Sequence, residues 1–104
     1  MRWLSETTKA AEHLGWKVIQ TDGLDDYQGW GVHLLLREDG TYGVLAWSYG
    51  SCSGCDSYEE EFYWGHEPAR DTPERYAEVF GALIEVVGPD KAAAELKFNE
   101  RKGW

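Results

Sequence analysis

The sequence predicts a single α+β domain that spans residues 1–104. An Asp-Gly dipeptide between two apolar segments indicates a β-hairpin, and apolar residues three and four positions apart indicate helices on both sides of it. A chain of 104 residues with 42% hydrophobic residues can bury one core. We therefore expect a small three-stranded antiparallel sheet, with an N-terminal helix and two or three C-terminal helices packed on one face.

The first quarter of the chain predicts a helix followed by a short strand. Residues 3–14 place Thr7, Ala11 and Leu14 on one helical face, and Gly15 supplies a stop. Residues 16–21 are rich in β-branched and aromatic side chains, which favour a strand. Residues 22–26 are acidic and contain glycine, so we expect a connecting loop there.

The central hairpin is predicted over residues 30–37 and 42–49. Asp39-Gly40 is a typical two-residue turn, and such a turn places Leu34 opposite Leu45 on the core face. Leu36, Val32 and Trp30 share that face with Gly43, Trp47 and Tyr49. The second face, which carries His33, Leu35, Arg37, Tyr42 and Val44 among others, is mixed, so we expect it to be only partly covered.

Three further helices are predicted after the hairpin. Asp56 can cap a short helix over 56–64, and Thr72 can cap a helix that continues to Val87 and ends at Gly88. A last helix is expected over residues 91–101, with Ala92, Ala93 and Leu96 facing inward.

Charge and composition restrict the classes of partner. The formal net charge is −9, from 19 acidic and 10 basic residues, which disfavours direct nucleic acid binding and attachment to an anionic membrane. Basic partner proteins, or imitation of nucleic acid toward a protein that binds it, fit this charge better. Because Met1 is followed at once by polar residues and no apolar stretch could span a bilayer, we expect a cytoplasmic location.

Both cysteines lie in the segment Gly50-Ser51-Cys52-Ser53-Gly54-Cys55-Asp56. We favour a structural turn, because the two glycines allow the chain to reverse and the serines can hydrogen-bond to a bent backbone. A zinc site is a second interpretation, with His66 as a further ligand or with the four thiolates of a homodimer. Redox chemistry is disfavoured by the neighbouring carboxylates, and a nest of amides that binds an anion is the fourth interpretation.

The run Tyr49-Gly50-Ser51-Cys52-Ser53-Gly54-Cys55-Asp56, together with Asp26-Tyr27-Gln28-Gly29 and the hairpin, resembles a group of small bacteriophage proteins of uncharacterised function, found mainly in phages of actinobacteria. The resemblance covers about residues 26–58. It implies a viral protein that acts in the host cytoplasm, and it brings no established activity with it.

The sequence favours a non-enzymatic function. It contains no nucleophile elbow, P-loop, dinucleotide fingerprint or H-E-x-x-H pattern, so we assign no catalytic residue and expect no cofactor. Our hypothesis is a protein-binding module, a phage accessory protein that engages or inhibits a host protein, in one version as an acidic mimic of nucleic acid. The predicted binding surface comprises Tyr27, His33, Leu35, Arg37, Tyr42, Val44 and Trp64. The alternative is a Cys-x-x-Cys protein that binds zinc through Cys52, Cys55 and His66 or that is redox-active.

Overall fold

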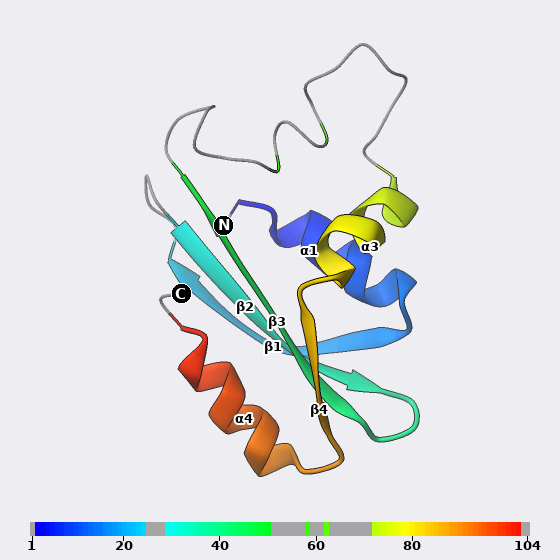
Figure 1. Cartoon of the computed structure of the whole chain (residues 1–104), viewed down its shortest axis with the longest axis vertical. Coiled ribbons are helices and arrows are strands. Elements are labelled where there is room, and N and C mark those ends of the chain that lie inside the picture. Colours follow the sequence, from blue (N-terminus) through cyan, green and yellow to red (C-terminus); the bar gives the residue numbers. More distant parts are fainter. Residues whose placement is uncertain (1, 25–28, 51–57, 59–61, 63–71, 103–104) are drawn as a thin grey trace.

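The computed structural model describes residues 2–24, 29–50, 58, 62 and 72–102. In these parts of the chain, the elements in order are α1 (Leu4–His13), β1 (Trp16–Leu24), β2 (Gly29–Arg37), β3 (Tyr42–Tyr49), α3 (Pro73–Gly81), β4 (Ile84–Gly88) and α4 (Lys91–Glu100). All strand pairs are antiparallel, and the sheet order is β1-β2-β3-β4 (Figure 1). The prediction of an α+β fold with a central hairpin is confirmed.

The predicted three-stranded sheet is wrong, because the described part of the chain forms four strands. Thr72 caps α3 as expected, since its hydroxyl oxygen accepts a hydrogen bond from the Arg75 amide at 3.2 Å. The helix ends at Gly81, however, and Ile84–Gly88 adds to the free edge of β3 as β4. The apolar residues there fit a helical stripe as well as a strand, and pairing with β3 decides between the two.

Strand β1 is also longer than predicted. Asp22, Gly23 and Leu24 continue the ladder with β2 instead of forming a loop, and Leu24 pairs with Trp30. The strand contains an irregularity between Val18 and Gln20, where one extra residue interrupts the register. Such a bulge allows a long edge strand to follow the twist of its neighbour.

The predicted register of the central hairpin is wrong by one residue. Leu34 pairs with Val44, so Leu34 and Leu45 point to opposite faces of the sheet. The cause is the turn: the Gly40 amide donates to the Arg37 carbonyl at 3.0 Å, and Gly40 has φ of 86°. Asp39 lacks the positive φ that a two-residue type I′ turn requires, so the loop has three residues, Glu38 to Gly40.

Helices cover both faces of the sheet, so the prediction that all helices pack on one face is wrong. On the first face, which we call the α1/α3 face, Leu35, Leu45, Trp47 and Tyr49 form a core with side chains that include Trp3 and Phe80. On the opposite face, the α4 face, the core consists of Val32, Leu34, Val44, Ala46, Ala94 and Phe98. Figure 1 shows α1 and α3 side by side, with α4 lying apart from them along the sheet.

Two cross-strand pairs of glycine and an aromatic residue fit this register. Gly31 pairs with Trp47 and Gly29 pairs with Tyr49. A Cβ atom on Gly31 would lie 2.2 Å from the Trp47 ring, and one on Gly29 would lie 2.1 Å from the Tyr49 ring. The rings therefore lie over the glycine backbone of β2, in space that any other side chain would occupy.

Helix α4 presents a different face to the sheet from the predicted one. Asp90 caps it through a hydrogen bond from the Ala92 amide at 3.0 Å, and Ala94 and Phe98 are buried. Ala92, Ala93 and Leu96 are exposed. The apolar residues of this short helix lie on several of its sides, so their spacing alone does not determine which side packs on the sheet.

The short helix predicted over residues 56–64 lies mostly outside the described residues. The two described positions within it, Tyr58 and Phe62, have helical backbone, and both rings approach Trp3 and Phe80 in the α1/α3 core. None of the helices in the described ranges is long and apolar enough to cross a membrane.

The substitution Gly31→Ala tests the glycine–aromatic pair. We expect it to lower the free energy of unfolding by about 3 kcal/mol, because the new methyl group must displace the buried Trp47 ring. Gly81→Ala is the matched control, since its Cβ meets only the tip of the exposed Leu14 side chain, and it should change stability by less than about 1 kcal/mol. Urea denaturation of both variants measures the difference; equal losses would contradict this packing.

A second pair of substitutions tests which face of α4 packs. Phe98→Ala should cost about 3–5 kcal/mol, because Phe98 is fully buried against the sheet. Leu96→Ala should cost less than about 0.5 kcal/mol, because that side chain is exposed. The midpoints of thermal or chemical unfolding give both values, and the reverse order would restore the face predicted from the sequence.

Candidate functional site

The residues of the predicted binding surface do not form one exposed face. His33, Leu35 and Val44 are fully buried, whereas Arg37 and Tyr42 are half-buried. The corrected register places His33, Leu35 and Arg37 on the α1/α3 face and Tyr42 and Val44 on the α4 face. The remaining two predicted residues, Tyr27 and Trp64, lie outside the described residues. Arg37 is the predicted residue that takes part in the site described below.

The cysteine segment lies outside the described residues as well, apart from the half-buried Gly50. This applies to the structural turn over 51–56 and to the zinc interpretation with Cys52, Cys55 and His66. Among the residues that are described, no group of three or more His, Cys, Asp or Glu side chains is placed to hold a metal ion. Both interpretations of the cysteines stay predictions.

His33 is the centre of a buried polar cluster. Its Nε2 lies 2.9 Å from the Thr7 hydroxyl of α1, and its Nδ1 lies 2.7 Å from the Thr21 hydroxyl of β1. Because the Thr7 hydroxyl donates to the Trp3 carbonyl at 2.8 Å, it must accept from His33, so Nε2 carries the ring proton. Nδ1 then accepts from Thr21. The neutral imidazole thus joins α1, β1 and β2, with the Trp47 ring packed against it.

This cluster has the connectivity of a nucleophile, a base and an orienting group, with Thr21 as the exposed hydroxyl. Its electrostatics oppose catalysis, because burial lowers the pKa of His33 to about 4. A general base that acts near neutral pH needs a pKa close to that pH. Both partners of the ring are uncharged hydroxyls, which stabilise an imidazolium poorly. We therefore assign His33 a structural role.

The pH dependence of stability tests this assignment. The folded pKa of His33, about 4, is below the ordinary value of 6.5, so between these values the unfolded state binds a proton that the native state does not. Stability is therefore fully present above pH 6.5 and falls by about 3 kcal/mol as the pH decreases to about 4. The variant His33→Gln should be less stable at pH 7 but should lack this loss. Parallel curves for both proteins between pH 7 and 4 would refute a neutral buried His33.

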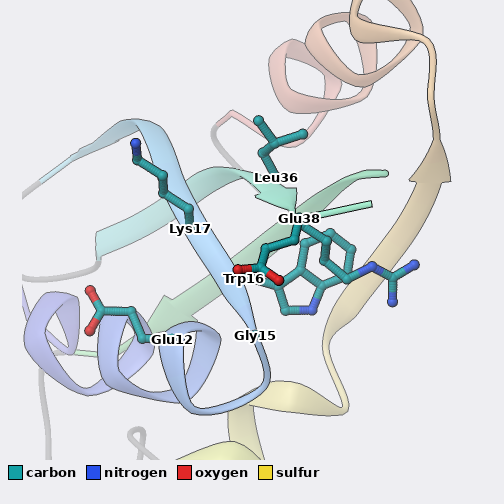
Figure 2. Close-up of a pocket in the computed structure, with 7 residues that line it drawn as sticks. Glu12, Gly15, Trp16, Lys17, Leu36 and Glu38 are labelled. Atoms are coloured by element: carbon teal, nitrogen blue, oxygen red, sulfur yellow. The ribbon is translucent and has the colours of Figure 1, made fainter. Parts of the chain in front are cut away.

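The concave feature chosen as the candidate site lies where α1, the start of β1 and the β2–β3 turn meet. A cavity of about 610 Å³ is lined by Glu12, Gly15, Trp16, Lys17, Leu36, Arg37 and Glu38 (Figure 2). A second hollow of about 460 Å³ adjoins it and adds Leu14 and Asp39 to the lining. We call the residues that line the two hollows the Arg37 corner. Trp16 and Arg37 are cross-strand partners at the end of the β1–β2 ladder.

The guanidinium group of Arg37 lies over the Trp16 ring and has unused hydrogen-bond donors. Its Cζ atom lies 4.4 Å from the centroid of the Trp16 ring, the geometry of a cation–π contact. Its Nε atom is buried and has no hydrogen-bond partner among the described residues; the nearest carboxylate oxygen, from Asp39, is 3.7 Å away. That Asp39 oxygen already accepts a hydrogen bond from the Thr41 amide, which lowers the pKa of Asp39.

Other charged groups around the cavity are unpaired within the described residues. Glu12, Lys17 and Glu38 make no ion pair or side-chain hydrogen bond there. In Figure 2, Lys17 and Trp16 project to different sides of β1, and Glu12 extends from α1 away from the Trp16 ring. The corner therefore presents two cations, Arg37 on the Trp16 ring and Lys17, together with several carboxylates.

Exposed apolar side chains lie beside the charged groups. Leu14 lines the second hollow and is exposed at the end of α1. Val86 of β4 pairs with Gly43, and the Trp16 ring lies over Gly43, since a Cβ there would be 3.0 Å from the ring. Val86 therefore projects on the same face as Trp16; it is exposed, and we count it as part of the Arg37 corner.

Sequence reasoning missed most of this site. It identified Arg37 but placed it on a partly covered face with His33 and Leu35, and it assigned no role to Trp16, Glu12 or Glu38. A signal was present, because a strand beginning with Trp16 directly after the helix stop at Gly15 must pair with the last residues before the turn. Val86 could not be found, because its strand was predicted as helix.

Comparisons with protein-family models, with curated proteins and with solved structures found no match to this chain.

Proposed function

We propose that this chain is a non-enzymatic protein-binding module that uses the Arg37 corner as its contact surface. The observation that carries the proposal is the coincidence of exposed apolar side chains, a stacked arginine with free donors and unpaired carboxylates at one concave corner. Interfaces combine an apolar centre and arginine with a charged rim, which is the composition of this corner.

The buried histidine supports a binding role over an enzymatic one. His33, the histidine that packs inside the domain, is buried and neutral, and threonine hydroxyls occupy both of its ring nitrogens. It is therefore committed to holding α1 against the sheet. In the Arg37 corner, hydrogen bonds from Thr41 lower the pKa of Asp39, which keeps this group a carboxylate and makes it a poor base.

The net charge and the resemblance to bacteriophage proteins both support a basic host protein as the partner. The formal charge of −9 favours a basic protein and raises its rate of encounter. The resemblance to small actinobacteriophage proteins, carried by Tyr49 to Asp56, supports a host protein as the partner and the host cytoplasm as the place of action. We propose that the chain engages or inhibits such a protein.

Imitation of nucleic acid is a narrower version of this proposal, and what the structure describes gives it no added support. Two of the acidic residues on which it depends, Asp22 and Glu74, are described; Glu74 is exposed on α3, whereas Asp22 forms an ion pair with Lys102 at 3.0 Å. The hydrogen bond from Lys102 lowers the pKa of Asp22 and neutralises its charge locally. A phosphate substitute would need that charge to remain available.

Affinity capture with matched surface variants tests the proposal. The immobilised chain should retain a specific protein from an actinobacterial lysate at low salt. Val86→Glu should reduce the retained amount at least about tenfold, since it introduces a charge into the apolar part of the contact. Leu96→Glu is the control, because Leu96 on α4 is 63% exposed and Val86 is 60% exposed.

The outcome distinguishes specific from incidental capture. Retention by the wild-type chain and by Leu96→Glu, with loss in Val86→Glu, supports a contact surface at the Arg37 corner. Equal retention by all three proteins would remove this corner as the binding surface. No retained protein under any condition would contradict the binding function itself.

A further inference from the structure

We infer that Arg37 is a receptor for a single carboxylate group, supplied by an Asp or Glu side chain that is flanked by basic residues on the partner protein. This inference rests on the proposed function for the identity of the partner, but the site itself can be tested with small probes. It specifies the chemistry that the Arg37 corner recognises.

Stacking on Trp16 prepares Arg37 to bind a planar anion. A guanidinium presents five N–H donors in one plane, and it recognises a carboxylate through two parallel hydrogen bonds. Contact with the indole ring, with Cζ 4.4 Å from the ring centroid, holds the guanidinium against the buried Trp16 side chain before any ligand arrives. Apart from the ion pair with Asp39, whose oxygen is 3.7 Å from Nε, Arg37 has no polar partner among the described residues, so no internal hydrogen bond must break on binding.

Arg37 differs in this respect from Arg75, an arginine of the same exposure. The side chains of Arg37 and Arg75 are equally exposed, at 36% each. Arg75 nevertheless donates to the Glu78 carboxylate at 2.6 Å, whereas the nearest carboxylate oxygen to Arg37 Nε lies 3.7 Å away, beyond hydrogen-bond distance. Arg37 therefore keeps donors that Arg75 has already used.

The surrounding charges determine the rest of the ligand. Glu12, Glu38 and Lys17 line the same cavity as Arg37, and Asp39 lies at its edge. The three carboxylates outnumber the two cations, so a doubly charged phosphate would be repelled more strongly than a single carboxylate, which can take its two hydrogen bonds from Arg37. Basic residues on either side of that carboxylate would meet Glu12 and Glu38. The charge pattern thus favours an acidic residue between two basic residues.

Two blocked tripeptides test this inference. Acetyl-Lys-Glu-Lys-amide carries the expected pattern, and acetyl-Lys-Gln-Lys-amide has the same size with the carboxylate removed. We expect the Glu peptide to bind about five- to tenfold more tightly than the Gln peptide, with a matching shift of the Arg37 Nε–H signal in ¹H–¹⁵N spectra. Arg37→Met keeps a long apolar stem for Trp16 and should abolish the difference, whereas Arg75→Met should preserve it.

Each measurement either supports or overturns the inference that Arg37 binds a carboxylate. Equal affinity of the two peptides for the wild-type chain, an unmoved Arg37 signal, or a preference that persists in Arg37→Met would overturn the inference. The wild-type measurements alone suffice if Arg37→Met does not give the dispersed spectrum of a folded protein. If the two peptides bind equally but Val86→Glu still loses the captured protein, the binding function stands and the carboxylate site does not. If the Arg37 signal responds to the Glu peptide but no protein is captured, the carboxylate site stands and the proposed partner does not.

Discussion

The turn between β2 and β3 controls the arrangement of the rest of this domain. Gly40, with its positive φ, closes a three-residue loop in which the Arg37 amide and carbonyl bond to Thr41 and Gly40. This loop fixes the register of the two central strands, and a shift of one residue would move every side chain to the other face. In the observed register, Trp47 lies over Gly31 and Tyr49 lies over Gly29, so the turn and the packing of the strands require the same alignment.

The two faces of the sheet are stabilised by different interactions. The α1/α3 face holds an aromatic core and the His33 cluster, in which Thr7 and Thr21 bind the two ring nitrogens. The α4 face is smaller, and ion pairs between Glu85 and both Lys97 and Arg101 secure its helix to the edge strand β4. The Arg37 corner forms at the end of the β1–β2 ladder, where the end of α1 meets the β2–β3 turn.

The proposed function follows from the hydrogen-bond donors and the exposed apolar side chains of the Arg37 corner. A domain of this size satisfies most of its buried polar groups, as His33 illustrates, so the buried Arg37 Nε, which has no hydrogen-bond partner among the described residues, is an exception. Trp16 supplies a rigid support rather than an exposed aromatic anchor, since the indole is itself buried beneath the guanidinium. The contact surface is thus an arginine on an aromatic base, with Leu14 and Val86 as apolar neighbours.

The sequence by itself determined the α+β class, the first helix, the hairpin strands, the cap at Thr72 and the start of the last helix, because short-range turn and capping chemistry carries these features. It also identified Arg37, although not its surroundings. Only the tertiary structure decided the fourth strand, the hairpin register and the face of α4. The apolar residues of β4 fit a helix or a strand, and both faces of β2 are apolar at Val32, Leu34 and Leu35. A pattern can select between two arrangements only when one of them exposes apolar surface, and here the packed helices cover both sides.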